Sequence, residues 1–316
     1  MKGEIKMVKA IKKAVVFIAA AAALSSYAQA ASIEVGEYVK LGSFSGEDIV
    51  WRCVSEDENG FLLLSDKILT LRAFDAAGKH SGDYKMLKQN FGNNNWDTSN
   101  LKCWLNSDAD KGGVKWECGN PPTERSVWNG YNAYDDDAGF LNLFSGSQKD
   151  AIKPVVQKQL LTYNEVYKEN KKAEGKDVHI SYSDPVENSL KNYDEAFYTT
   201  SEDKVFVLDM KQLYDVWKNS DILGERYYIG TITDKCYENT EYKFGIGKGA
   251  EWHTWLRTPY STSERAMTMR HLWNNGWVER AHPYLSYIGV RPAFYFNVDA
   301  AFDGGNGSEQ SPYVIK

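Results

Sequence analysis

The segment between residues 255 and 294 places the strongest constraint on what this chain can fold into. It begins with Trp255-Leu256-Arg257-Thr258-Pro259 and ends with Gly289-Val290-Arg291-Pro292-Ala293-Phe294, and both stretches are typical of strands. The residues between them are rich in Trp, Tyr, His, Arg and Met. Two stiff strands around large, chemically varied side chains indicate a scaffold that presents a recognition surface, rather than a set of catalytic acids, bases and nucleophiles.

The first thirty residues have the pattern of a secretory signal peptide. Several lysines precede an apolar run, Ala14–Leu24, that is too short to span a bilayer in the usual way. Ala28-Gln29-Ala30 then provides the small residues that a signal peptidase recognises. We therefore expect cleavage after Ala30 and a protein that is secreted, periplasmic or on the cell surface. An uncleaved membrane anchor is the alternative, and the polar Ser25 and Ser26 disfavour it.

The chain that remains after cleavage is acidic. Loss of the lysine-rich start leaves a net charge of about −10, against −6 for the whole sequence. Nucleic acid and anionic membranes repel an acidic protein, so we expect neither as a main partner. No second hydrophobic stretch approaches membrane-spanning length, and we expect no stable membrane insertion after cleavage.

Four cysteines follow the cleavage site, and their even number favours disulfides in an oxidising compartment. We predict one bridge between Cys103 and Cys118, which closes a short loop. A second bridge, between Cys53 and Cys236, would tie an early strand to the later half of the chain. The alternative is that some are free thiols, because free Cys is often buried. No C-x-x-C spacing occurs, so zinc ligation is not expected.

The order of predicted elements is strands, then a few helices, then strands. Residues 33–71 read as β, with Asn59-Gly60 as a hairpin turn, and the last part of the chain is again β-rich. Short helices are expected after Thr98 or Ser99 and after Asp209, where a polar cap precedes apolar residues at helical spacing. This order predicts an α+β fold with mixed or antiparallel sheets, two or three short helices and long loops.

We expect one domain over residues 31–316 with two surface insertions. The first, near 107–139, is rich in Gly, Asn, Asp and Pro, and the second, near 165–200, is charged and irregular. A helix is predicted over 147–152, ahead of Pro154. The continuous apolar run at 204–208 predicts a buried strand.

Several separated stretches of the sequence belong to one pattern: Ile49-Val50-Trp51-Arg52, Ser99-Asn100-Leu101-Lys102-Cys103-Trp104-Leu105-Asn106, Phe140-Leu141-Asn142-Leu143-Phe144-Ser145, Asp203-Lys204-Val205-Phe206-Val207-Leu208, and the two C-terminal motifs. Together they resemble a bacterial family described only as domain of unknown function six-two-seven-three, over nearly the whole exported chain. That family is distantly similar to the C-type-lectin-like fold of formylglycine-generating enzymes and retroelement-diversified binding proteins. The resemblance implies a C-type-lectin-like domain, and since that fold hosts oxidases and binders alike, it does not decide between them.

Within the C-terminal segment the sequence predicts a β-hairpin. Met267–Leu272 would be the incoming strand, Trp273-Asn274-Asn275-Gly276-Trp277 contains an Asn-Gly turn, and Val278–Ala281 would be the outgoing strand. In the diversified binding relatives this region is the ligand face, as the resemblance implies. We predict that contacts to a ligand come from the hairpin and the loop after it: Arg270, His271, Trp273, Asn274, Trp277, His282 and Tyr284. The alternative is that these aromatic residues pack the sheet against the insertions.

Arg257 and Arg291 lie inside the two framing motifs, and we interpret both as structural. An Arg in an otherwise apolar strand is usually paired with a carboxylate or with backbone carbonyls. Contact with a ligand is the alternative for each of them.

No catalytic residue and no metal site are predicted. The resemblance would place the reactive cysteine pair of a formylglycine-generating oxidase near the C-terminus, but the last cysteine is Cys236. An iron-dependent subgroup uses clustered histidines, and three histidines of this region match no tight ligand spacing: His253, His271 and His282. Calcium, the usual lectin cofactor, has only weak candidates in the loop that starts at Asn106 and in Asp135-Asp136-Asp137.

We expect an exported, non-catalytic protein whose aromatic surface binds a glycan, a peptide or a cell-surface protein, since Trp and Tyr rings stack on sugars. One alternative is a metal-dependent oxidase or hydrolase of the formylglycine-generating superfamily, which metal analysis of the purified protein would reveal. Another is a structural component of the envelope, which self-association in solution would favour.

Overall fold

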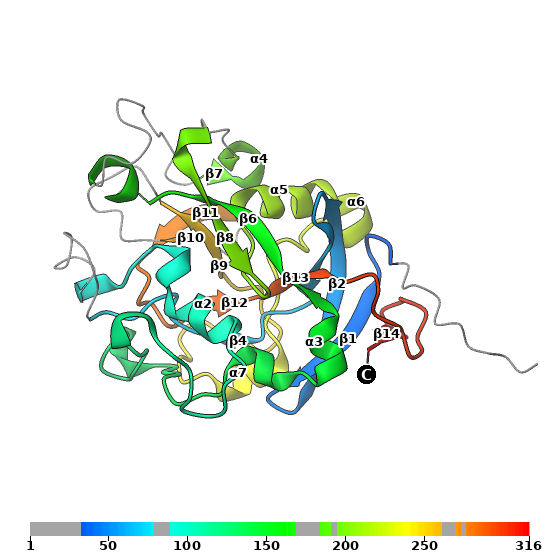
Figure 1. Ribbon diagram of the computed structural model, residues 1–316, viewed down its shortest axis with the longest axis horizontal. Helices are drawn as coiled ribbons and strands as arrows, with labels where there is room; N and C mark the ends of the chain where they lie inside the picture. Colours follow the sequence, from blue (N-terminus) through cyan, green and yellow to red (C-terminus); the bar gives the residue numbers. More distant parts are fainter. Residues whose placement is uncertain are drawn as a thin grey trace, which may run out of the picture.

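The computed structural model describes residues 33–78, 89–162, 164–168, 184–190, 195–260, 269–272 and 276–315. Within these ranges the chain forms two six-stranded sheets, one two-stranded sheet and a set of short helices joined by long loops (Figure 1). The predicted α+β class with mixed sheets is confirmed. The predicted signal peptide, residues 1–30, lies outside the described part of the chain.

The first sheet contains the early hairpin that the sequence predicts. Its strands, in spatial order, are β14 Tyr313–Val314, β1 Tyr38–Phe44, β2 Glu47–Asp57, β3 Gly60–Ser65, β13 Ala293–Phe296 and β5 Ile152–Lys153. β14 runs parallel to β1 and the other pairs are antiparallel. Ile49, Trp51 and Cys53 alternate toward the core along β2, as the two-residue period of a strand requires. Gly60 closes the β2–β3 turn with a φ of +108°, which glycine adopts without strain.

The second sheet contains the C-terminal hairpin. Its strands, in spatial order, are β4 Thr70–Leu71, β12 Gly289–Val290, β9 Thr254–Pro259, β10 Met269–Leu272, β11 Trp277–Ala281 and β7 Asp184–Pro185. The second framing motif therefore belongs to both sheets, because β12 lies in this one and β13 in the first. Our prediction of a single strand over 289–294 is wrong. Pro292 has no N–H for a ladder, and the chain changes sheets at Arg291 and Pro292.

The helices are short, and the described residues contain more of them than the two or three predicted. They are α2 Asn100–Leu105, α3 Gly146–Asp150, α4 Val186–Ser189, α5 Met210–Lys218, α6 Ser220–Leu223 and α7 Asp234–Asn239. Ser99 caps α2 by accepting a hydrogen bond from the Lys102 N–H, and Asp209 forms a capping box with Gln212 at α5. These two predicted starts are confirmed. The predicted 147–152 helix is α3, which ends earlier because Ile152 already pairs with β13 as part of β5.

Residues 205–208 of the predicted 204–208 strand are buried, as predicted, whereas Lys204 is exposed, and the run is not a strand of either large sheet. Phe206 makes one isolated bridge to Ala293 before the chain turns into the Asp209 cap of α5. The regular strand lies just before it: β8 Tyr198–Asp203 pairs antiparallel with β6 Val155–Leu160. The predicted surface insertion near 165–200 overlaps the start of β8, and most of that insertion lies outside the described residues.

One core cluster draws residues from both large sheets, among them Trp51, Phe294, Trp255 and Leu256. Residues 107–139 contain only short 3-10 turns, yet Tyr134 from this segment is fully buried in that core. A smaller cluster lies between β4 and α7 and contains Leu71 and Cys236. In the described residues, no helix combines the length and apolarity needed to cross a bilayer.

Candidate binding surface around the C-terminal hairpin

The predicted C-terminal hairpin is present in the second sheet, where β10 and β11 are adjacent strands. β10 and β11 are antiparallel, with Met269 opposite Ala281 and Leu272 opposite Val278. β10 also pairs with β9, so the hairpin continues directly from the first framing motif. The short strand β7 covers the outer side of β11.

The structure describes some of the predicted contact residues fully, some only by their backbone and some not at all. Trp273 and Asn274 lie outside the described residues. Arg270 and His271 belong to β10, where their backbones pair with Arg280 and Glu279, and their side chains are not among those described. Trp277 is 43% exposed, whereas its neighbour Val278 is buried. The exposed side of β11 therefore begins at Trp277.

His282 and Tyr284 join Phe91 in an aromatic cluster directly after β11. The Phe91 ring stacks on the His282 ring at a centroid distance of 4.4 Å and meets the Tyr284 ring edge-on at 5.7 Å. The Tyr284 N–H donates to the Phe91 carbonyl at 3.0 Å, which fixes the two segments together. Burial, together with the charge of Arg280, lowers the pKa of His282, so this imidazole is neutral at pH 7. All three side chains are half-buried.

A second aromatic cluster continues along the same loop. Tyr242 stacks on Tyr287 at 4.9 Å, and Trp128 meets Tyr287 edge-on at 5.1 Å. Tyr131 lies against both Trp128 and Tyr242, at 5.9 and 6.0 Å. The Trp128 N–H donates to the Tyr284 carbonyl at 2.9 Å, which links the two clusters. We call the seven half-buried residues of both clusters the aromatic band: Phe91, Trp128, Tyr131, Tyr242, His282, Tyr284 and Tyr287.

The sequence pointed to His282 and Tyr284 but not to the other five members of the band. Trp128 and Tyr131 stand out as aromatic residues within a polar insertion, but nothing in the sequence places that insertion against residues 284–287. The contact depends on hydrogen bonds between distant segments, such as Asn132 Nδ2 to the Ser286 carbonyl at 2.7 Å. The position of Trp128 and Tyr131 inside a Gly- and Asn-rich insertion is a signal that could have found these two residues, whereas Phe91, Tyr242 and Tyr287 carry no such signal.

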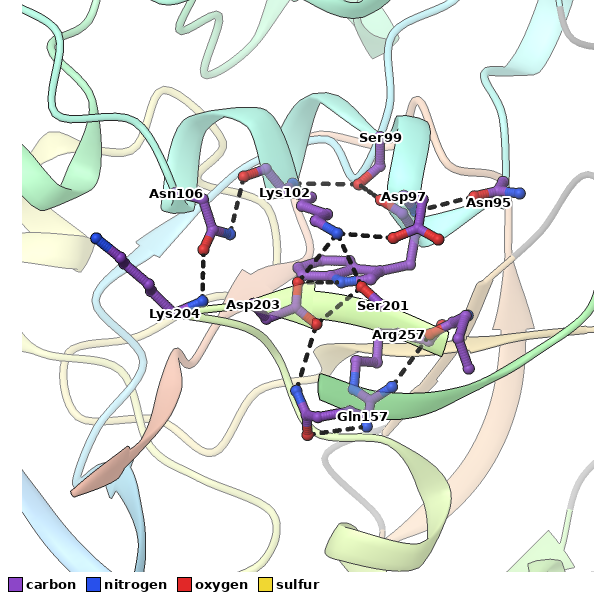
Figure 2. Close-up of polar contacts among 12 residues, drawn as sticks. Asn95, Asp97, Ser99, Lys102, Asn106, Gln157, Ser201, Asp203, Lys204 and Arg257 are labelled. Carbon is purple, nitrogen blue, oxygen red and sulfur yellow. Dashed lines mark hydrogen bonds and ion pairs between the residues drawn. The ribbon is translucent and has the colours of Figure 1, made fainter. Parts of the chain in front are cut away.

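A buried polar network anchors β9, the strand that pairs with β10 of the hairpin (Figure 2). The Asp203 carboxylate accepts hydrogen bonds from the Trp96 indole at 2.9 Å and from the Ser201 hydroxyl at 2.9 Å. Lys102 Nζ lies 3.3 Å from the same carboxylate. Gln157 joins the two halves of the network, because it donates to Asp203 at 3.3 Å and accepts from Arg257 at 3.2 Å.

The chain's own acceptors engage both framing arginines. Arg257, 2% exposed, pairs with Asp209 at 2.6 Å and donates to the Lys158 carbonyl at 2.9 Å. Arg291 donates to three backbone carbonyls at 2.8 to 3.0 Å, those of Ser65, Tyr227 and Asp66. These contacts are those of structural arginines, in line with our interpretation of both residues.

All four cysteines are free thiols, so the two predicted disulfides are not formed. Cys53 lies in the main core and Cys236 in the smaller cluster beside α7, where each thiol packs as a small apolar group. Burial raises the pKa of each of these two thiols to about 12. Cys103 is half-buried beside the Glu117 backbone, and Cys118 is exposed. The spacing of the cysteines alone does not reveal that Cys53 and Cys236 occupy separate clusters.

Thiol alkylation should separate these cysteines. With iodoacetamide at pH 8 we expect Cys118 to react first, and Cys53 and Cys236 to react only after unfolding, because they are buried and protonated. Mass spectrometry of the native and the unfolded protein measures this order. A purified protein whose intact mass indicates two disulfides would contradict it.

Two of the residues considered for metals, Asn106 and His253, make hydrogen bonds with the chain's own backbone. Asn106 accepts from the Lys204 and Val205 N–H groups and donates to the Val205 carbonyl, which ties the end of α2 to the buried apolar run. Burial lowers the pKa of His253 to about 4, so it is neutral at pH 7. The described residues contain no group of three or more His, Cys, Asp or Glu side chains that could hold a metal ion.

Comparison with known proteins gives one family. A family model described as "Domain of unknown function (DUF6273)" matches residues 58–298, a span that includes both framing motifs, the hairpin and every member of the aromatic band. No curated protein and no solved structure matches the chain.

Proposed function

The chain belongs to the family described as Domain of unknown function (DUF6273), and from this premise we propose that it is a non-catalytic binding protein. Its ligand is a glycan, a peptide or a cell-surface protein, held by the aromatic band and by Trp277 at the start of β11. The observation that carries the proposal is the gathering of seven half-buried aromatic side chains around one loop, 282–287.

Half-buried rings suit a binding surface for a physical reason. Their inner atoms are fixed by the contacts within the band, so little side-chain entropy is lost when a ligand covers the outer faces. Trp and Tyr rings present broad apolar faces to sugars and to apolar side chains, and the Tyr hydroxyls add directed hydrogen bonds. The neutral His282 contributes a hydrogen-bonding imidazole without a charge that would have to be desolvated.

The proposal includes export and a C-type-lectin-like domain. Export is supported by the lysine-rich start, the apolar run Ala14–Leu24 and the small residues up to Ala30. The lectin-like assignment is supported by the two C-terminal motifs and by mixed sheets with long loops. In such a domain the long loops carry the ligand and the sheets hold them in place.

Single substitutions test the proposed surface. Trp277→Ala and Tyr284→Ala should each weaken retention on an array of bacterial glycans and surface proteins by about tenfold or more, because aromatic residues dominate binding at such surfaces. Both variants should keep a melting temperature close to that of the wild type, since neither side chain is fully buried. Array retention and thermal melts are measured on the same preparations.

Tyr313→Ala is the matched control. Tyr313 is also a half-buried tyrosine with a stacked neighbour, Phe302 at 4.2 Å, but it belongs to β14 in the other sheet. The Tyr313→Ala substitution should leave retention on the array unchanged. If Trp277→Ala and Tyr284→Ala collapse the melt without a specific loss of retention, these residues are packing residues and the proposed surface is wrong.

A further inference from the structure

Five members of the aromatic band have side-chain polar atoms that face solvent. Within the described residues, no hydrogen bond joins the chain to the indole N–H or the hydroxyl groups of these five: Trp128, Tyr131, Tyr242, Tyr284 and Tyr287. None of these atoms is buried. The ring of each residue is therefore held by its neighbours, while its N–H or O–H group remains available to a ligand.

The groups that face solvent carry no charge. Burial and the nearby Tyr131 raise the pKa of Tyr242. Burial and the neighbouring Tyr242 and Tyr284 raise the pKa of Tyr287. Both hydroxyls are therefore protonated at pH 7, and a protonated Tyr hydroxyl both donates and accepts hydrogen bonds. A ligand that satisfies such groups needs uncharged donors and acceptors of its own.

Three charged residues lie next to the band in the sequence, and each of them interacts with another part of the chain. The Glu241 carboxylate accepts a backbone N–H of the insertion at 2.6 Å, and Lys243 donates to the Tyr237 carbonyl. The Arg280 guanidinium lies over the Tyr260 ring, 5.6 Å from its centroid. The whole sequence has a net charge of −6, which disfavours an anionic ligand. These observations favour a neutral ligand.

The rings of the second cluster do not form one flat platform. The Trp128 ring is inclined by 59° to 73° to the three tyrosine rings around it. Tyr131 and Tyr242 are inclined to each other by 67°. Rings turned at such angles contact a ligand from different sides, whereas the flat face of a crystalline polysaccharide needs rings in one plane. The arrangement therefore suits a short, soluble chain.

We propose that the aromatic band binds an uncharged oligosaccharide. Ring faces pack on the C–H faces of the sugar, and the Trp128 N–H and the Tyr hydroxyls exchange hydrogen bonds with sugar hydroxyls. An apolar peptide segment would cover these polar groups without giving them partners, which costs free energy. The inference rests on the proposed function, because it names the ligand class of the same surface.

Isothermal titration of the purified protein with soluble oligosaccharides tests the ligand class. Maltohexaose, laminarihexaose, xylohexaose and N-acetylchitohexaose are the uncharged probes, and hexagalacturonate is their anionic control. We expect saturable binding of at least one uncharged probe and no binding of hexagalacturonate. The inference is overturned if no uncharged probe binds at millimolar concentration, or if hexagalacturonate binds equally well.

Two variants test the hydroxyl groups separately from the rings. Tyr242→Phe and Tyr287→Phe should each weaken binding of the uncharged oligosaccharide by about fivefold, the usual effect of one lost hydrogen bond. Both should keep the wild-type melting temperature, because neither hydroxyl bonds to the described part of the chain. Tyr313→Phe is the control outside the band, where the hydroxyl bonds to Glu37 at 3.4 Å, and it should leave binding unchanged. Wild-type affinity of both band variants contradicts the inference.

Failure of this inference can be distinguished from failure of the proposed function. If the array retains the protein on peptides or proteins but on no uncharged glycan, and Tyr284→Ala abolishes that retention, the surface binds a ligand that is not a saccharide. If the protein is retained by nothing on the array and binds no oligosaccharide in solution, the proposed function is wrong as well.

Discussion

Replacing Arg257 with Met is expected to lower the free energy of unfolding by about 3–5 kcal/mol, the usual cost of removing one partner of a buried ion pair. Arg257 is 2% exposed and pairs with Asp209 at 2.6 Å. It also donates to the Lys158 carbonyl at 2.9 Å and to Gln159 Oε1 at 3.1 Å. Methionine fills part of the space but satisfies none of these acceptors, and it leaves the Asp209 carboxylate partly buried without its cation. Urea unfolding of the wild type and the variant measures the loss.

Arg226→Met is the matched control for this prediction. Arg226 makes an equally short pair with Glu251, at 2.6 Å, but its side chain is 51% exposed. Water replaces the partner at such a site, and we expect a change of no more than about 1 kcal/mol. Equal effects of the two substitutions would mean that Arg257 contributes no more than a surface ion pair. Ligand retention by Arg257→Met below its melting temperature should stay near the wild-type level, because Arg257 is buried and is not a member of the aromatic band.

Trp51→Ala is expected to lower the free energy of unfolding by about 3–5 kcal/mol, the range for a buried aromatic residue replaced by alanine. Trp51 is fully buried in β2 and meets Phe294 edge-on at 4.8 Å. Its indole N–H donates to the Leu41 carbonyl at 2.8 Å, at the point where the register of β1 shifts. The substitution therefore leaves both a cavity and an unpaired buried carbonyl. Thermal and urea unfolding measure the effect.

Trp277→Ala provides the comparison within the same residue type. Trp277 is 43% exposed at the start of β11, and we expect its removal to change stability by no more than about 0.5 kcal/mol. A loss similar to that of Trp51→Ala would show that Trp277 is a core residue, and it would then be withdrawn from the proposed binding surface.

The local elements could be predicted because their causes lie within a few residues of sequence. Ser99 and Asp209 cap their helices through backbone groups three residues away, and Asn59-Gly60 turns the β2–β3 hairpin. The C-terminal hairpin is predictable for the same reason. The prediction is wrong where a distant segment determines the local structure. Ile152 was predicted to be helical but pairs with β13, and Pro292 separates two strands that belong to different sheets.

The candidate sites depend on the fold to a much larger extent. The rings of Phe91 and His282 are in contact although the two residues are far apart in the sequence. Trp128 contacts Tyr287 from an insertion that contains no regular strand. The same contacts decide which hydroxyl groups of the band face solvent without a partner in the described chain. None of these contacts has a period or spacing that could be recognised in the sequence.

The sequence by itself determined the α+β class, the positions of the helix caps and the hairpins, and the concentration of aromatic residues between Trp255 and Phe294. Propensity, capping and turn geometry act over neighbouring residues, so they can be read along the chain. Only the tertiary structure decided which aromatic residues meet in the aromatic band, which groups pair with each framing arginine and which cysteines are apart. Those outcomes depend on burial and on the meeting of distant segments, which local sequence does not encode.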